Sequence, residues 1–273
     1  MRNDQWHGSG ARSLSATHAA LGFVAGLLIA MVTAPVGVSG AVFLLPVQLS
    51  VLNVPSPSVT PTNLLFNVVA TPGALVRYRH QGQLVGPLTR QLVTGTLPGV
   101  VIGAMIHVYF AAGPRAFRLS AAAVLLPLGV WLLAREVIPT GSAHRSGLAA
   151  RTISTLAFGV GVIGGIYGIG GGSILAPILV GSGLSVASVA PAALAATFIT
   201  SLLGAVTYAL LALTTTGPVA PNWQLGLVCG LGGLVGGYLG ARLQPRLPES
   251  RLRVLLGTLA VALAITYVVQ AVG

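Results

Sequence analysis

The chain contains two long segments without a single charged residue, and these segments constrain its fold more than any other feature. Residues 13–76 and 152–241 contain no Lys, Arg, Asp or Glu. One helix needs only about 20 apolar residues to cross a bilayer, so each segment is long enough for several crossings. A soluble domain of this size would carry roughly 25% charged residues, whereas this chain carries 6%. We therefore expect an all-α polytopic membrane protein that is surrounded by the lipid bilayer.

The basic residues are all arginines, 14 in number, and only three acidic residues oppose them, which gives a net charge of +11. In a soluble protein such an excess would indicate nucleic acid binding. Here the arginines fall in loops between apolar runs, where they set membrane topology and contact lipid headgroups. We therefore expect no nucleic acid partner.

Two glycine-containing blocks in the two halves of the chain have nearly the same sequence. Residues 37–46 read GVSGAVFLLP and residues 168–177 read GIGGGSILAP, and both blocks interrupt long apolar runs. A glycine break before a short apolar segment, at corresponding positions of two halves, is typical of the binding sites of membrane transporters. The pattern therefore predicts a transporter with an internal repeat.

The similarity between the halves extends beyond these blocks. Residues 58–64 align with 188–194, and residues 95–99 align with 232–236. The difference in residue number between aligned residues grows from 130 for the first of these pairs to 137 for the second. The second half therefore has a longer loop near residues 214–222. Collinear matches of this kind indicate a duplication rather than chance identity in apolar sequence.

The duplication predicts the organisation of the whole chain. An N-terminal tail of residues 1–18 precedes a first repeat of residues 19–134, and a linker of residues 135–151 leads to a second repeat of residues 152–273. Two apolar runs, 41–53 and 173–184, are too short to span a bilayer and are expected to be half-length helices. The longer runs are 19–36, 62–76, 91–110, 117–134, 152–167, 192–213, 224–241 and 254–272. Each repeat is thus expected to have about four spans and one half-length helix after the glycine-rich break.

The arginines indicate how the two repeats are oriented. The loop that contains Arg77, Arg79 and Arg90 is basic, whereas its repeat counterpart at residues 209–223 is uncharged. Because basic loops face the cytoplasm, corresponding loops lie on opposite sides of the membrane, which indicates inverted repeats with the N-terminus outside. Parallel repeats of four spans each are the alternative.

The second glycine block resembles a known family. The segment from Gly168 to Gly172, with Pro177 and then the stretch from Pro191 to Thr197, is similar to that of the sulfite exporter TauE/SafE family of membrane permeases. The resemblance covers about residues 19–272. It implies transport of small sulfur-containing anions, such as sulfite or organosulfonates, across the bacterial plasma membrane.

A small oxyanion inside a membrane needs hydrogen-bond donors, and the start of a helix supplies them. The first N–H groups of a helix have no partner within it, and the helix dipole adds about half a positive charge there. Glycines allow the backbone to approach a ligand closely, although glycine clusters also serve helix packing alone. Asn63 and Asn67 lie four residues apart on one helix face. The candidate substrate-binding residues are Gly37, Ser39, Gly40, Thr62, Asn63, Asn67, Gly168, Gly170, Gly171, Gly172, Ser173 and Thr197.

The absence of certain residue types from the predicted spans narrows the range of possible functions. The spans have no Asp or Glu, which disfavours a carboxylate proton relay, and they lack the dyads or metal ligands of an enzyme. We expect a small anionic substrate as the partner, and no cofactor. Whether the protein forms a homodimer is left open. His107, Tyr78 and Tyr208 lie near span ends and are interpreted as interfacial residues. The alternatives are an anion channel, a transporter of a non-sulfur small organic anion, or a structural subunit.

Overall fold

The computed structural model describes residues 16–50, 56–84, 86–110, 114–137, 148–213 and 221–272, and these residues form helices without any strand. The predicted tail, most of the linker and the loop at residues 214–220 lie outside the described residues. Eight long helices lie within this part of the chain. They are α1 (Ala16–Thr33), α3 (Ser56–His80), α4 (Pro87–Phe110), α5 (Pro114–Val137), α6 (Ala150–Tyr167), α8 (Val186–Ala212), α9 (Trp223–Leu243) and α10 (Glu249–Val272).

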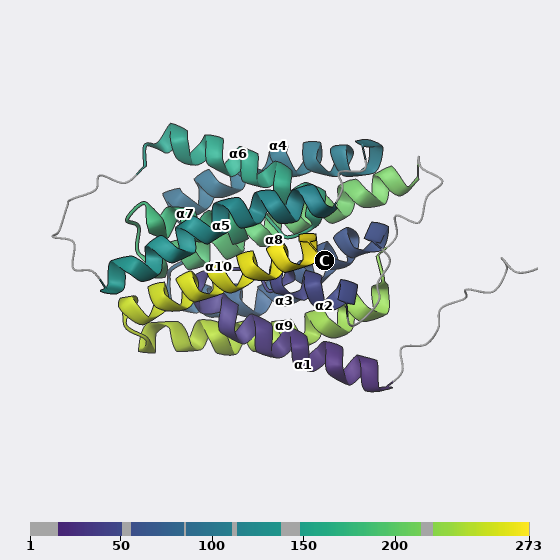
Figure 1. Cartoon of the computed structure of the whole chain (residues 1–273). Coiled ribbons are helices and arrows are strands. Elements are labelled where there is room, and N and C mark those ends of the chain that lie inside the picture. The colour runs from purple at the N-terminus through teal and green to yellow at the C-terminus, as the bar shows by residue number, and fades with distance from the viewer. Residues whose placement is uncertain are drawn as a thin grey trace, which may run out of the picture.

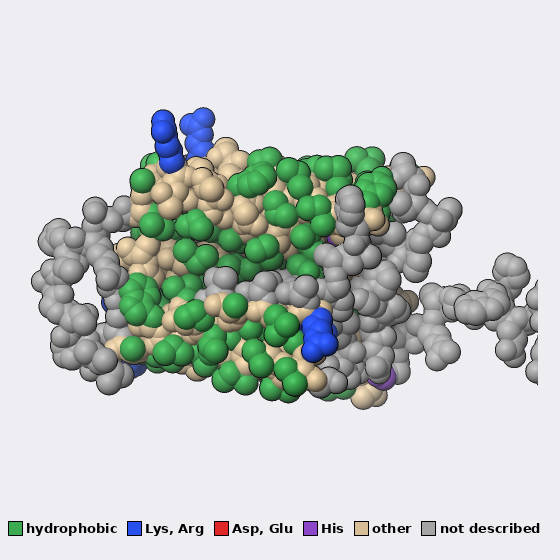
Figure 2. Space-filling model, turned by 45° about the horizontal axis from the view of Figure 1, so that its top comes forward, with side chains coloured by type: hydrophobic (Ala, Val, Ile, Leu, Met, Phe, Trp, Pro, Cys, Tyr) green, Lys and Arg blue, Asp and Glu red, His purple; other side chains and the backbone are tan. Residues whose placement is uncertain are grey.

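Seven of these helices are long and apolar enough to cross a membrane. In the remaining one, α5, the described apolar stretch is shorter and covers Leu125–Ala134. Large apolar side chains such as Val206 and Leu210 are half or more exposed, which is costly in water but favourable against lipid. Figure 2 shows a surface largely covered by hydrophobic side chains, with the arginine side chains near its ends. The chain is therefore a multi-pass membrane protein.

The helices lie side by side along roughly one direction (Figure 1), in pairs that differ in burial. α1 packs against α9, α4 against α6, and α5 against α10. The spans of α3 and α8 are the most enclosed, with 67% of an 18-residue apolar window buried in each, and these two helices also pack against each other. Side chains on α3 and α8 are therefore the ones best placed to line an interior site.

The glycine breaks precede two short helices, as expected from the run lengths. α2 (Ala41–Ser50) and α7 (Gly172–Gly181) have ten residues each. The chain turns into them through residues in the left-handed region, Gly37 with φ of 77° and Gly168 with φ of 69°. Such angles are strained for residues with a Cβ, so glycine is required where the chain reverses. Helices of ten residues cross only about half of a bilayer.

Two helices begin earlier than the apolar runs indicate. α3 starts at Ser56 rather than 62 and α8 starts at Val186 rather than 192. The sequence reading treats Pro61 and Pro191 as breaks, but both prolines lie inside the helices. Membrane helices tolerate internal proline because neighbouring helices and polar side chains satisfy the freed backbone groups.

Basic residues gather at one end of the bundle. The side chain of Gln81, after α3, donates to the carbonyl of Ala241 near the end of α9, and Gln91 near the start of α4 donates to Ala150 at the start of α6. These contacts bring the ends of α3 and α9 together with the starts of α4 and α6. We call this region the basic end, and its arginines are Arg77, Arg79, Arg90, Arg151, Arg242, Arg246, Arg251 and Arg253.

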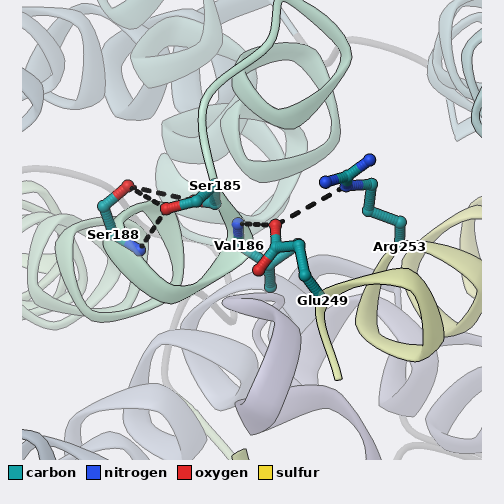
Figure 3. A network of polar contacts seen from close by, with 5 residues as sticks. All are labelled: Ser185, Val186, Ser188, Glu249 and Arg253. Carbon is teal, nitrogen blue, oxygen red and sulfur yellow. Dashed lines mark hydrogen bonds and ion pairs between the residues drawn. The ribbon is translucent and has the colours of Figure 1, made fainter. Parts of the chain in front are cut away.

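A polar network joins α8 and α10 at the same end. Glu249, at the start of α10, accepts a hydrogen bond of 2.7 Å from the backbone N–H of Val186 and lies 3.6 Å from Arg253. The side chain of Ser185 caps α8 by accepting from the N–H of Ser188. Figure 3 shows Glu249 between the start of α8 and Arg253. A carboxylate at a helix N-terminus is favourable because it meets unpaired N–H groups and the positive end of the dipole.

Helix α1 runs parallel to α9 and starts at the opposite end of the bundle. A Cβ added to Gly26 would overlap the carbonyl of Cys229, and one added to Gly240 would overlap that of Met31, so residue numbers rise together along the two helices. Contacts of this closeness are typical of membrane helices that pack through small residues. A Cβ added to four further glycines would also lie too close to a backbone or side-chain atom of the adjacent helix. These glycines are Gly95, Gly99, Gly103 and Gly236.

Candidate functional site

The two short helices start next to each other inside the bundle. The backbone N–H of Ser39, just before α2, donates a hydrogen bond of 3.1 Å to the hydroxyl of Ser173 on α7. Both residues are buried, at 3% exposure each. The glycine blocks, which lie far apart in sequence, therefore meet at one place.

Asn67 on α3 is the centre of the polar contacts at this place. Its side-chain carbonyl accepts from the hydroxyl of Ser39, and its amide donates to the carbonyl of Gly168 at 3.3 Å and to the hydroxyl of Ser201 on α8 at 3.1 Å. The side chains of Asn67 and Ser201 have no exposed surface. We call Ser39, Asn67, Ser173 and Ser201 the central polar cluster.

The N-terminus of α7 already has acceptors for its first N–H groups. The N–H of Gly172 donates to the hydroxyl of Thr197 at 3.2 Å, and that of Gly171 donates to the hydroxyl of Thr200 at 3.4 Å. Thr200 in turn donates to the carbonyl of Ala196 on its own helix. Two of the donors expected to bind a ligand at this helix tip, the N–H groups of Gly171 and Gly172, are thus satisfied by threonines of α8.

The N-terminus of α2 borders a small cavity instead. Its polar lining consists of Thr33, Ser39, Gly40, Asn67 and Thr71, and its volume of ≈ 20 Å³ leaves room for about one water molecule. The hydroxyl of Thr33 has no hydrogen-bond partner among the described residues. Within the same part of the chain, the N–H of Gly40 makes no hydrogen bond either. Two unpaired donors are therefore available at the α2 tip.

A single aligned pair of residues distinguishes the surroundings of the two tips, although a second cavity of ≈ 20 Å³ borders Ser173 and Ile174 of α7. Gly233 on α9 lines the cavity beside α2. Its counterpart in the other half is Thr96 on α4, whose methyl group would lie 2.7 Å from a Cβ at Gly171. The extra side chain occupies the space beside α7 that glycine leaves open beside α2.

Asn63 lies one helical turn before Asn67 and has no partner. Its side chain is fully buried, and neither its amide nitrogen nor its oxygen has a hydrogen-bond partner among the described residues. Its Cβ would lie 3.1 Å from a Cβ at Gly168, which places it beside the second glycine block. A buried amide without partners is costly, so a ligand or water molecule has reason to bind there.

Most of the predicted glycines are closely packed. A Cβ at Gly37 would lie 2.5 Å from the Cα of Ala190, and one at Gly170 would lie 2.5 Å from Thr197. Added Cβ atoms at Gly168 and Gly172 would overlap backbone carbonyl oxygens of α3 and α8. In this structure Gly37 and Gly168 therefore allow the two halves to approach each other, and Gly170 and Gly172 allow α7 to lie close to α8.

Thr62 lies apart from the central polar cluster. Its hydroxyl donates to the carbonyl of Ser58 at 2.5 Å and accepts from the N–H of Asn222 at 2.8 Å. Asn222 caps the start of α9, where its side chain accepts from the N–H of Leu225. Thr62 thus connects α3 to the start of α9, and the structure does not bring it to the other candidates.

Thr62→Val should therefore affect stability and leave substrate affinity unchanged. The variant leaves the N–H of Asn222 without its acceptor, which costs about 1–3 kcal/mol for a buried donor. Thermal unfolding in detergent and the KM of transport in liposomes measure the two effects. A large rise in KM without loss of stability would return Thr62 to the binding site.

Two lining residues, Thr33 and Thr71, are absent from the sequence-based candidates. Thr71 lies one helical turn after Asn67, so the four-residue spacing that links Asn63 to Asn67 could have identified it. Thr33 ends α1 four residues before Gly37, and nothing in its neighbourhood distinguishes it from other hydroxyls in apolar sequence. Thr200 and Ser201 also contact the candidates, as described above.

Tyr78 and Tyr208 are not interfacial residues, so that interpretation is wrong. They are 0% and 2% exposed, and each hydroxyl donates to a backbone carbonyl inside the bundle at 3.0 Å. His107 lies with its ring centroid 5.7 Å from that of Tyr208. A tyrosine buried this deeply needs a hydrogen-bond partner, and each one finds it at the end of another helix.

A bundle of membrane-crossing helices, with two short helices that meet at a buried polar cluster, defines a multi-pass membrane transporter. Residues 21–267 match the sequence model of the family described as Sulfite exporter TauE/SafE, and the chain belongs to this family. It is also similar to the probable membrane transporter protein YunE of Bacillus subtilis (strain 168), with 26% identity over 250 residues that cover 82% of this chain and 88% of that protein.

Proposed function

We propose that the chain transports a small sulfur-containing oxyanion, such as sulfite or a sulfonate, across the bacterial plasma membrane. The observation that carries this proposal is the tip of α2, where the unpaired Gly40 N–H and the unpaired Thr33 hydroxyl border one cavity. The positive end of the α2 dipole points to the same place. The description of the family supplies the substrate class.

Neutral donors suit a substrate that has to leave again. Among the described residues, no Arg, Lys, Asp or Glu lines the cavity. Hydroxyl, amide and backbone N–H groups bind oxyanion oxygens without a fixed positive charge, and transport requires binding that is weak enough for release. Asn67 holds the lining hydroxyl of Ser39 in place through its side-chain carbonyl.

The proposed architecture is two inverted repeats, residues 19–134 and 152–273, related by an axis in the membrane plane. Several contacts support it, because they recur between aligned residues. α1 packs against α9 and its counterpart α6 packs against α4. α2 contacts α3 as α7 contacts α8. With the basic end in the cytoplasm, α1 enters from outside and α6 enters from inside.

The size of the cavity supports a mechanism of alternating access. An oxyanion of four or more heavy atoms is larger than the single water molecule that fits in ≈ 20 Å³. The walls therefore have to move before substrate enters, and a pathway open to both sides at once would be a channel. We propose that one repeat moves against the other around the α2 and α7 tips.

Uptake into liposomes by the purified protein tests this function. Sulfite, thiosulfate, a sulfonate, sulfate and a small carboxylate are supplied separately, and saturable uptake of the sulfur oxyanions is the expected result. Saturable uptake of the carboxylate alone would replace the substrate class by organic anions. Ohmic anion conductance would indicate a channel, and no uptake of any anion would reject the proposal.

A further inference from the structure

The short 3₁₀ turn η1 (Ala34–Val36), which directly follows α1, is held by two side chains from other parts of the bundle. The hydroxyl of Tyr78 on α3 donates to the carbonyl of Ala34 at 3.0 Å. The side chain of Gln244, just after α9, donates to the carbonyl of Pro35 at 2.7 Å. Carbonyls at the end of a helix lack partners within it, and here buried side chains supply them. We call this arrangement the first clamp.

The last residues of α6 are held in the same manner. The hydroxyl of Tyr208 on α8 donates to the carbonyl of Gly165 at 3.0 Å. The imidazole of His107 on α4 packs edge-on against the ring of Tyr208, with the centroids 5.7 Å apart and the backbone of Ile166 beside it, and the hydroxyl of Thr60 donates to the carbonyl of Ile166 at 3.2 Å. We call the contacts made by Tyr208 and His107 the second clamp.

The members of the two clamps are counterparts in the internal alignment. Tyr78 aligns with Tyr208 in the register that pairs α3 with α8, and His107 aligns with Gln244 in the register that pairs α4 with α9. The accepting carbonyls, just after α1 and at the end of α6, are counterparts in the register of the two glycine blocks. The duplication thus places an equivalent tyrosine-to-carbonyl contact in each repeat.

The clamps lie at opposite ends of the bundle. Tyr78 lies between Arg77 and Arg79 at the end of α3, which is part of the basic end. His107 lies in the last turn of α4, at the end where α1 and α9 start. Ala34 is itself part of the cavity lining, so the first clamp closes the cavity on the side of the basic end.

We propose that the two clamps are the gates of the transport pathway, the first on the basic end and the second on the opposite end. This inference rests on the proposed function, since it assigns the residues that close the pathway on each side. Both clamps are closed in this structure, and the cavity that Ala34 of the first clamp lines has a volume of only ≈ 20 Å³. When one clamp opens, its tyrosine hydroxyl and the freed carbonyl are hydrated by the water that enters. The left-handed glycines Gly37 and Gly168 follow the clamped carbonyls closely and serve as hinges.

Sided labelling of a single cysteine tests the gates without any transport measurement. Cys229, the sole cysteine of the chain, is replaced by Ser, and Thr71→Cys places a reporter in the cavity lining. A membrane-impermeant thiol reagent is added to right-side-out or inverted membrane vesicles. Removal of one hydrogen bond with Tyr78→Phe should raise labelling from the basic end by about 3- to 10-fold, with no rise from the other side. Tyr208→Phe should raise it from the opposite end alone.

Exchange variants separate gating from general stability. His107→Ala should act as Tyr208→Phe does, whereas His107→Gln supplies the amide of the first clamp and should restore labelling to the wild-type rate. Gln244→Ala should act as Tyr78→Phe does. Tyr109→Phe is the matched control, because Tyr109 lies two residues from His107 and is 60% exposed, and it should change nothing.

The sidedness of the result decides the inference. Labelling that rises equally from both sides would show that the clamps only stabilise the fold, and labelling that does not rise, or rises from the wrong side, would also overturn the inference. Sided labelling in a protein that takes up no anion would leave the gates in place and reject the substrate class. Thermal unfolding of each variant in detergent confirms that the labelled protein is folded.

Discussion

Asn67→Asp should nearly abolish anion transport in a protein that still folds. Asp has the same shape as Asn, so the new carboxylate can still accept from the Ser39 hydroxyl beside the cavity. A negative charge about 4 Å from a bound anion costs roughly 4 kcal/mol at an effective dielectric constant near 20, which is about a thousandfold loss of affinity. The initial rate of sulfite uptake into liposomes, measured against sulfite concentration, gives the effect.

Ser201→Ala is the control for this prediction. It removes one acceptor of the Asn67 amide and introduces no charge, so a loss of less than about tenfold is expected for a single neutral hydrogen bond. Sulfite uptake by Asn67→Asp close to that of the wild type would place the substrate away from the α2 tip. An equal loss in both variants would indicate that the polar cluster acts through folding rather than through charge at the site.

The sequence predicts the parts of the site that depend on backbone geometry. The apolar runs 41–53 and 173–184, which follow the glycine breaks, are too short to span a bilayer. The short helices α2 and α7 therefore follow from run length and from the need for positive φ at Gly37 and Gly168. The i, i+4 spacing of Asn63 and Asn67 places both amides on one face, and the structure has both of them buried. Periodicity and chain reversal are local properties, so they can be read from one sequence.

The choice of hydrogen-bond partners could not be read in this way. Thr197 is among the predicted ligands of an anion, yet its hydroxyl accepts from the N–H of Gly172. The unpaired N–H of Gly40 lies at the other tip, where Ala70 occupies the position aligned with Thr200. Tyr78 and Tyr208 lie near helix ends in sequence, but their partners lie just after α1 and at the end of α6. Which hydroxyl meets which N–H or carbonyl depends on how helices from different repeats pack, and no local pattern contains that information.

Gly172→Ala should severely destabilise the protein, although alanine favours helices. A Cβ at Gly172 would overlap the carbonyl oxygen of Ala193 and lie 2.7 Å from the Thr197 hydroxyl. Backbone atoms of α8 cannot rotate away, so α7 would have to shift as a whole, and the expected cost is about 3 kcal/mol, at the upper end for an overpacked interior. We expect a lower unfolding temperature in detergent and poor recovery of folded protein.

Gly159→Ala is the matched control, because it makes the same change in a helix with open space around it. No atom of a neighbouring residue lies within 4 Å of a Cβ at Gly159, which is on the exposed side of α6. Alanine gains up to about 1 kcal/mol over glycine from helix propensity, so this variant should be as stable as the wild type or slightly more so. Comparable unfolding temperatures for the two variants would mean that α7 moves freely against α8. Close packing would then not explain why the second block contains glycines. Direct contact with substrate would become the better explanation for Gly172.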